Sequence, residues 1–273
     1  MVKQENIPKL TILVVFGLFF AASCGGRSDA DPSKQPAKDT PEKRGEEIVA
    51  EYLKRDAAPY RKMRVRFTIK TDGEPDKIYE VDNWRKQTAE ASTTLSQIVK
   101  PADESDLGSL TIEAEGQKAM VITYAASRGD FRETGTNKMF FGGLTAGELL
   151  GEWDKFLFKF VGEKEVDGRK LLDVEGYLKA GADSVASRMN VMFRTDNYVP
   201  AELHLFDAAG REIRTYKIVD FKDDPDHPYA AKTEVENPIY KAKIVIEILS
   251  RELPTTIDDA MFTREKLKEF AKK

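Results

Sequence analysis

The sequence has very few of the residues that usually carry catalysis or cross-linking. Its 273 residues include one cysteine and two histidines. A single cysteine excludes an internal disulfide framework. His204 and His227 have neither a cysteine nor a second histidine nearby, whereas a zinc site needs three or four such ligands. We therefore expect no metal, no cofactor and no enzymatic activity.

Other motifs of catalysis or ligand binding are also missing. Gly142 and Gly143 are not followed by the Gly-Lys-Ser/Thr of a phosphate-binding loop, and no serine stands in a nucleophile elbow. The acidic cluster Asp223, Asp224 and Asp226 lacks the register of a calcium-binding loop. A solvated turn is the simpler interpretation of that cluster.

The chain also lacks a basic block and a long hydrophobic run. Lys and Arg number 43 against 47 Asp and Glu, for a net charge of −4. A mildly acidic chain without clustered cations excludes nucleic acid as an expected partner. Its main apolar run, residues 10–22, is shorter than the ~20 residues that a membrane-spanning helix needs.

That apolar run has the features of an export signal. Lys3 and Lys9 precede it, and small residues follow it up to Cys24, which is the arrangement of a secretory signal peptide. The sequence Ala21-Ala22-Ser23-Cys24 resembles a relaxed lipobox, with Ala21 in the place of the usual large aliphatic residue. We expect cleavage before Cys24 and lipidation of its thiol; the alternative is an ordinary signal peptide in which Cys24 is incidental.

Three regions follow from this pattern. Residues 1–23 are the predicted lipoprotein signal peptide, and residues 24–42 are a flexible tether rich in Gly, Ser, Pro and charge. Residues 43–273 are the predicted folded domain. No aspartate follows Cys24, so we expect an outer-membrane lipid anchor that holds the domain on the periplasmic side.

The sequence predicts a mainly β (α+β) domain. An apolar stripe of Ile48, Val49, Tyr52 and Leu53 predicts a helix at its start. Thr145 with Glu148 predicts the capped start of a short helix in the middle, whose apolar stripe would comprise Leu144, Leu149, Leu150 and Trp153. Between and after them we expect about ten antiparallel strands in meander order, because period-two alternation recurs without intervening helices. The predicted strands begin with 64–70, 77–88, 90–100, 108–115 and 118–125, continue through the hairpins at 166–168 and 209–210, and end with the pair before residue 253; a short amphipathic helix closes the chain. Such a sheet must curl to protect its edges, and helices that cap it would enclose an apolar cavity.

Aromatic residues gather in the middle third of the chain. Ordinary core packing explains most of them, but Met139-Phe140-Phe141 beside two glycines does not read as a plain strand. Because ligand sites are concave, apolar and rich in aromatic side chains, this run is a candidate lid over a pocket.

Several segments in order resemble the LolA-like outer-membrane lipoprotein-sorting family. They are Ile98 to Gly108 with its Pro-x-Asp turn, Met139 to Leu150, Val161 to Arg169, Phe193 to Gly210, and the ending from Leu253 to Thr263. The likeness covers roughly residues 60–270, with Phe193 standing where the family has tryptophan.

The resemblance implies an incomplete β-barrel closed by helices around a hydrophobic cavity, with acyl chains of lipoproteins or lipids as partners. It implies lipoprotein sorting or lipid transport at the outer membrane, without catalysis, and we expect a monomer. The alternative is a structural or surface-exposed lipoprotein that binds a protein partner. The cavity candidates are Val65, Phe67, Ile69, Phe131, Met139, Phe140, Phe141, Trp153, Phe158 and Phe193.

Overall fold

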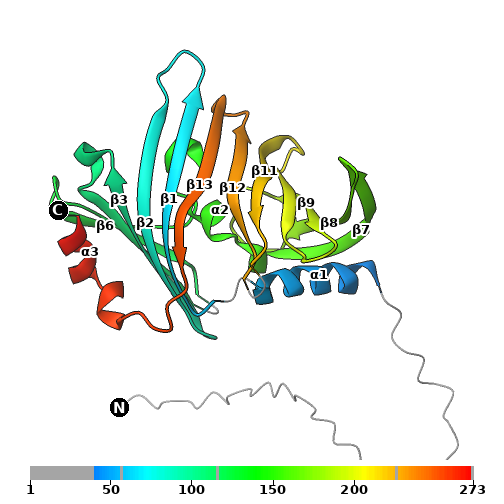
Figure 1. The fold of residues 1–273 in the computed structure, drawn as a ribbon, viewed down its shortest axis with the longest axis horizontal. Coiled ribbons are helices and arrows are strands. Elements are labelled where there is room, and N and C mark those ends of the chain that lie inside the picture. Colours follow the sequence, from blue (N-terminus) through cyan, green and yellow to red (C-terminus); the bar gives the residue numbers. More distant parts are fainter. Residues whose placement is uncertain (1–39, 56–57, 115–116, 225–226, 272–273) are drawn as a thin grey trace, which may run out of the picture. The chain divides into compact units, whose positions relative to one another are not determined.

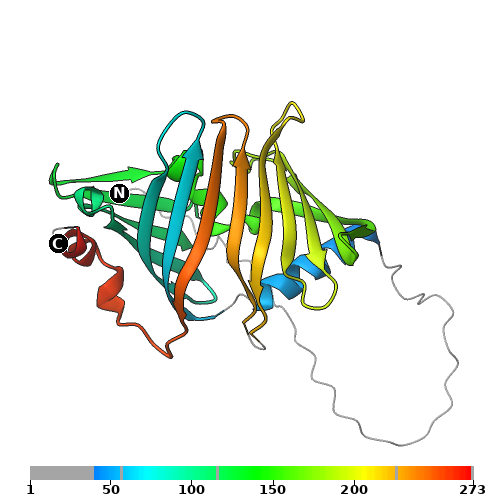
Figure 2. The ribbon, with the colours of Figure 1, turned by 45° about the horizontal axis from the view of Figure 1, so that its top comes forward.

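Thirteen antiparallel strands form one continuous sheet (Figures 1 and 2). The computed structural model describes residues 40–55, 58–114, 117–224 and 227–271, so the predicted signal peptide, Cys24 and nearly all of the predicted tether lie outside the described residues. The strands are β1 (Tyr60–Thr71), β2 (Lys77–Gln87), β3 (Ala91–Lys100), β4 (Leu107–Ala114), β5 (Met120–Ala125), β6 (Asp130–Thr134), β7 (Phe156–Val166), β8 (Arg169–Leu178), β9 (Arg188–Arg194), β10 (Pro200–Phe206), β11 (Glu212–Lys222), β12 (Tyr229–Asn237) and β13 (Ala242–Glu252).

The strand order is two meanders joined at the first and last strands. It runs β6-β5-β4-β3-β2-β1-β13-β12-β11-β10-β9-β8-β7, and β1 pairs with β13 over ten positions from Lys62 to Thr71. The predicted meander order is therefore confirmed for strands that follow one another in the sequence, but the predicted number of strands is wrong. The central pairing of β1 with β13 was also missed, because it is long-range and local alternation does not encode it. The sheet ends at β6 and β7 and is not closed into a barrel.

The chain travels from one sheet edge to the other through residues 135–155, which we call the crossover segment. It contains a 3-10 turn (Phe141–Gly143), the short helix α2 (Ala146–Leu150) and a second 3-10 turn (Trp153–Lys155). The crossover segment lies behind β1, β13 and β12 in Figure 1. We call the sheet face that it touches the inner face.

Helix α1 (Pro41–Arg55) covers the inner face at the β7 end, which confirms the predicted helix. Leu53 of the predicted stripe is nevertheless 42% exposed, because it lies in the last turn of the helix. Ile48 and Val49 are buried among aromatic and aliphatic side chains of β7 to β10. A carboxylate oxygen of Glu46 accepts a hydrogen bond of 2.8 Å from the Phe158 backbone N–H. The helix therefore occupies part of the hydrogen-bonding edge that β7 would otherwise expose.

Helix α3 (Arg264–Phe270) covers the opposite, outer face of β3 to β5. Leu95, Leu110 and Ile122 meet fully buried Leu267 there. Strands alternate their side chains between two faces, so the apolar face of β3–β5 points away from the inner face. At the β7 end of the sheet the apolar face is instead the inner one. Because the apolar residues of β3–β5 pack against α3 on the outer face, the inner face of these strands can carry polar residues.

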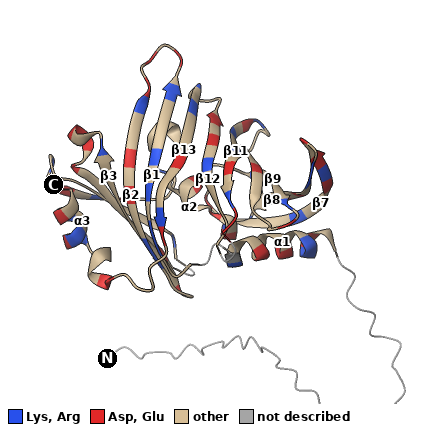
Figure 3. Ribbon diagram, in the orientation of Figure 1, with Lys and Arg blue, Asp and Glu red and all other residues tan. Residues whose placement is uncertain are grey.

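The central strands carry charged residues of both signs (Figure 3), and cross-strand ion pairs lie on their outer face. Cross-strand pairs such as Arg64 with Asp82, at 2.7 Å, and Lys232 with Glu247, at 3.2 Å, join neighbouring strands there. None of the helices in the described part of the chain has both the length and the apolar content to span a membrane.

Candidate ligand cavity

The inner face and the crossover segment form a half-open cavity of about 1900 Å³. That volume exceeds the ~300–1,000 Å³ typical of small-molecule pockets. Its wall is formed by β1 to β5, by β10 to β13 and by the crossover segment. The space is large enough for a ligand with a long chain.

One part of the wall is apolar and centres on Phe141. The Phe141 ring lies 4.7 Å, centroid to centroid, from the rings of both Phe67 on β1 and Tyr79 on β2. Val65 and Ile69 flank Phe67 on the same face of β1 and are buried with it. Further apolar side chains of this wall are Met63, Phe140, Leu203, Ile218, Ile246 and Ile248.

Seven of the ten predicted cavity residues line this space. They are Val65, Phe67, Ile69, Met139, Phe140, Phe141 and Trp153; their contact with a ligand stays a prediction. Phe158 and Phe193 lie instead in the core beneath α1, and Phe131 packs against Tyr124 in the core beneath α3. Sequence reasoning could not separate these three, since a buried aromatic in a strand has the same pattern in a core and in a cavity.

The Met139-Phe140-Phe141-Gly142-Gly143 run is packed against the sheet along part of its length. Gly142 and Gly143 both have positive φ, at 64° and 83°, a conformation that suits glycine. A Cβ atom on Gly142 would lie 2.7 Å from the Ile244 side chain. The glycines thus let the backbone approach β13 closely, with Phe141 inserted beside β1.

A buried polar network fixes the crossover segment to β11. Arg214 is 3% exposed, and its guanidinium donates hydrogen bonds to the Gly143 carbonyl at 2.5 Å and to the Asn237 side-chain oxygen at 2.8 Å. Its Nε lies 3.0 Å from a carboxylate oxygen of Glu148. Tyr216 donates to the same carboxylate at 3.1 Å, and burial followed by that negative charge holds the tyrosine pKa well above its usual value.

The predicted capping box of the middle helix is confirmed and belongs to this network. The Thr145 hydroxyl accepts from the Glu148 backbone N–H, and the Glu148 carboxylate accepts from the Thr145 backbone N–H at 2.7 Å. The helix is shorter than the sequence predicted, because Gly151 ends it in a left-handed conformation. Leu149, expected on its buried stripe, is 42% exposed.

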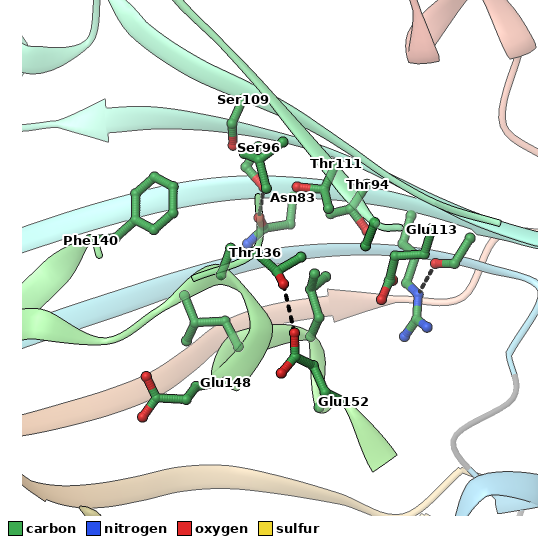
Figure 4. Close-up of a pocket in the computed structure, with 18 of the residues that line it drawn as sticks. Asn83, Thr94, Ser96, Ser109, Thr111, Glu113, Thr136, Phe140, Glu148 and Glu152 are labelled. Carbon is green, nitrogen blue, oxygen red and sulfur yellow. Dashed lines mark hydrogen bonds between the residues drawn. The ribbon is translucent and has the colours of Figure 1, made fainter. Parts of the chain in front are cut away.

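The other part of the cavity wall is polar, a feature that was not predicted from the sequence. Asn83, Ser96 and Ser109 face the space from β2, β3 and β4, with Thr94 and Thr111 one step farther along their strands (Figure 4). The sequence signal for this polar surface is the alternation of Ser and Thr with apolar residues in β3 and β4. That alternation does not determine which face of the sheet is concave.

Charged groups lie at the far end of this polar wall. Glu113 is half-buried, and its pKa is raised by burial, against the opposing effect of Arg85 and with a further upward contribution from Asp154 and Glu152. Glu152 accepts hydrogen bonds from the Thr136 hydroxyl at 2.7 Å and from the Lys155 ammonium at 2.5 Å. Glu152 and Lys155 thus form an ion pair beside Glu113.

No group of three or more His, Cys, Asp or Glu side chains within the described ranges is arranged to hold a metal ion. His204 lies on β10, where its Nδ1 is 2.8 Å from a Glu212 carboxylate oxygen. The prediction that the protein is not an enzyme stays a prediction.

Solved structures with the same fold are known. A DUF1329 family protein from Desulfovibrio piger superimposes with a TM-score of 0.78 at 18% identity, covering 84% of this chain and 99% of that one. A domain described as an outer membrane lipoprotein-sorting protein from Vibrio parahaemolyticus gives a TM-score of 0.76 at 14% identity, covering 83% and 99%. A LolA superfamily protein from Nitrosomonas europaea gives 0.66 at 12% identity, covering 81% and 98%.

These similarities confirm the fold that the sequence resemblance implied. No curated protein matches the chain. The model of a protein family whose description is "Uncharacterized protein" matches residues 90–269, which is more than half of the chain. The chain therefore belongs to that family and has a LolA-like fold.

Proposed function

We propose that this protein binds the acyl chains of a lipid or lipoprotein in its cavity and acts as a carrier or acceptor in the cell envelope. The observation that carries the proposal is the cavity of about 1900 Å³ with an apolar wall on β1, β13 and the crossover segment. Burial of an acyl chain there would contribute ~0.8 kcal/mol per CH₂ group. Two proteins of the same fold, described as lipoprotein-sorting and LolA superfamily proteins, support the proposal.

The side chains of the apolar wall also favour a bound chain over a purely structural interior. Ile246 and Ile248 on β13 and Met63 on β1 are only partly buried, although they point toward the centre of the fold. A side chain of this kind gains further burial when a hydrocarbon chain lies against it. These three residues, with Phe140, form the proposed contact surface for the acyl chain.

The proposal is tested by titrating the purified, delipidated protein with a fluorescent probe that carries a palmitoyl chain. The variant Ile248→Lys places a charge in the apolar wall and should weaken binding by about tenfold or more, since an unpaired buried ammonium is costly. Leu249→Lys is the matched control, because Leu249 is the next residue on β13 and is 41% exposed. Absence of probe binding by the unmodified protein would contradict the proposal.

We further propose that Cys24 carries the lipid anchor and that the domain faces the periplasm from the outer membrane. The support is the sequence pattern alone, since Cys24 lies outside the described residues. Several acyl chains on one cysteine would give stable membrane attachment. A tethered protein suits the role of a fixed acceptor or relay better than that of a diffusing shuttle.

The anchor is tested by metabolic labelling with radioactive palmitate and by membrane fractionation. The unmodified chain should incorporate label and sediment with outer membranes, and Cys24→Ala should do neither. Equal label in the two proteins would contradict lipidation at Cys24. A labelled chain that fractionates with inner membranes would leave lipidation intact and contradict the outer-membrane location.

A further inference from the structure

The polar part of the cavity wall consists of ordered rows that cross neighbouring strands. The register places Asn83 opposite Ser96, Ser96 opposite Ser109, and Ser109 opposite Thr123. Two residues farther along the strands, a second row joins Arg85, Thr94 and Thr111, and a third joins Gln87, Ser92 and Glu113. All these residues line the cavity, and together we call them the polar rows.

Each strand changes from apolar to polar along its length. Before the first polar row, on the same face, β2 carries Val81, β3 carries Ile98 and β4 carries Leu107. Val81 and Ile98 are buried in the core cluster that contains Phe67, and Leu107 packs against it. The cavity therefore has an apolar end at Phe141 and a polar end at Glu113.

Several hydroxyl groups of the polar rows have no hydrogen-bond partner among the side chains and backbone of the described residues. Thr111 is only 6% exposed, and neither its hydroxyl nor those of Thr94 and Ser109 forms such a bond. A hydrocarbon chain lying here would bury these groups unsatisfied, at a cost of ~1–3 kcal/mol each. The polar rows thus disfavour an acyl chain and suit a ligand that brings its own hydrogen-bonding groups.

The charges around the polar rows disfavour an anionic head group. Glu113 and Glu152 stand at their far end (Figure 4). Of the cations at this end, Arg85 donates to Ser92 at 3.0 Å and Lys155 pairs with Glu152 at 2.5 Å. A phosphate recognition site uses cationic forks or exposed backbone N–H groups. The hydroxyls of these rows, with the amides of Asn83 and Gln87, instead match a neutral head group with many hydroxyls, whose O–H groups both donate and accept.

We infer that the ligand is a lipid with an uncharged, polyhydroxylated head group, and that this head group lies inside the cavity on the polar rows while its acyl chain lies along β1 and β13. The inference rests on the proposed function and names its substrate class. Rows two residues apart are separated by ~6.6 Å along a strand, so the three rows offer a surface longer than one sugar ring.

The test compares three amphiphiles that share a dodecyl chain, each titrated below its critical micelle concentration into delipidated protein and followed by calorimetry. Dodecyl maltoside has a neutral polyhydroxylated head, dodecyl octaethylene glycol ether has a neutral head without multiple hydroxyls, and dodecylphosphocholine has a phosphate. We expect the maltoside to bind about tenfold more tightly than either of the others, as two or so net hydrogen bonds would give.

The variants Thr94→Val and Thr111→Val remove hydroxyls from the second polar row with little change of shape. Each should reduce the preference for the maltoside over the ether severalfold, with the affinity for the ether unchanged. Thr93→Val is the matched control, because Thr93 is the neighbouring residue on β3 and faces away from the cavity. Thermal unfolding of the ligand-free variants checks that all three fold as the unmodified protein does.

The outcomes separate the inference from the proposed function. If the maltoside bound no more tightly than the ether, the inference would be overturned and acyl binding would remain supported. The same would follow if dodecylphosphocholine bound most tightly of the three. An unchanged preference in both valine variants would also overturn it. Failure of all three amphiphiles to bind would overturn the proposed function and the inference together.

Discussion

The guanidinium of Arg214 donates a hydrogen bond of 2.5 Å to the backbone carbonyl of Gly143, which lies 71 positions earlier in the chain. This contact joins the crossover segment to β11 in the fold's interior. Gly143 is held from a second side as well, because the Asn237 amide donates to the adjacent Gly142 carbonyl at 2.8 Å. The position of Phe141, and with it the shape of the apolar wall, depends on these bonds.

Replacement of Arg214 by methionine should lower the free energy of unfolding by about 3–5 kcal/mol, because it leaves the Glu148 carboxylate buried without its cation. The two side chains are 4% and 3% exposed. Urea denaturation measures the effect. Arg211→Met is the control, because Arg211 pairs with Asp207 at the surface with its side chain 80% exposed, and such pairs contribute about 0–1 kcal/mol. Losses of equal size in the two variants would contradict the role assigned to Arg214.

Replacement of Gly45 by alanine should destabilise the protein, although alanine is favoured over glycine by about 1 kcal/mol inside a helix. The added Cβ would lie 2.7–2.8 Å from backbone atoms of Lys159, so α1 would have to move away from β7. Gly135→Ala serves as the control, since its Cβ would meet no atom within 4 Å. A higher thermal midpoint for Gly45→Ala than for the unmodified protein would refute the close packing of α1 on β7.

Glu113→Gln should make the protein more stable at neutral and alkaline pH. The pKa of Glu113 is raised in the folded state, chiefly by burial. A raised carboxyl pKa contributes stability that is present below the unfolded pKa and is lost as the pH rises through the folded value. The variant should therefore equal the unmodified protein in acid and exceed it above the folded pKa, as measured by chemical denaturation over a pH series.

Glu80→Gln should change the stability at neutral pH in the opposite direction, making the protein less stable. The pKa of Glu80 is lowered, first by the hydrogen bond from Arg66 and then, against burial, by Lys100; Arg66 lies at 2.8 Å and Lys100 at 3.2 Å. The stability that Glu80 contributes is present above its unfolded pKa and is lost as the pH falls through the folded one. The variant should be less stable at neutral pH and match the unmodified protein in acid. If Glu113→Gln and Glu80→Gln changed the stability at neutral pH in the same direction, the environments assigned to the two carboxyl groups would be contradicted.

The sequence predicted the elements that have a local signature. The apolar stripe around Ile48 identified α1, and Thr145 with Glu148 identified the capped start of α2, because a helix period and a capping box are both short-range patterns. The strands were located to within a few residues for the same reason. The short edge strand β6 (Asp130–Thr134) was not predicted, since five residues with two exposed charges show little alternation.

The long-range arrangement was not predictable from those patterns. The pairing of β1 with β13 joins residues 190 positions apart, as in the Lys62–Glu252 ion pair, and no local signal encodes it. The polar end of the cavity was missed because the apolar residues of β3, such as Leu95, pack against α3 on the outer face. Which face of an alternating strand points inward is decided by α3, whose docking site the sequence pattern does not reveal.

The most direct test of the central claim is to identify the molecules that copurify with the full-length protein extracted from its own membranes. We expect an acyl-bearing lipid, chemically distinct from any modification of Cys24, at about one molecule per chain. Native mass spectrometry of the delipidated protein should then show the same lipid taken up again from vesicles. A protein that carries no such lipid, and takes up none from vesicles that contain the cell's own lipids, would contradict the account.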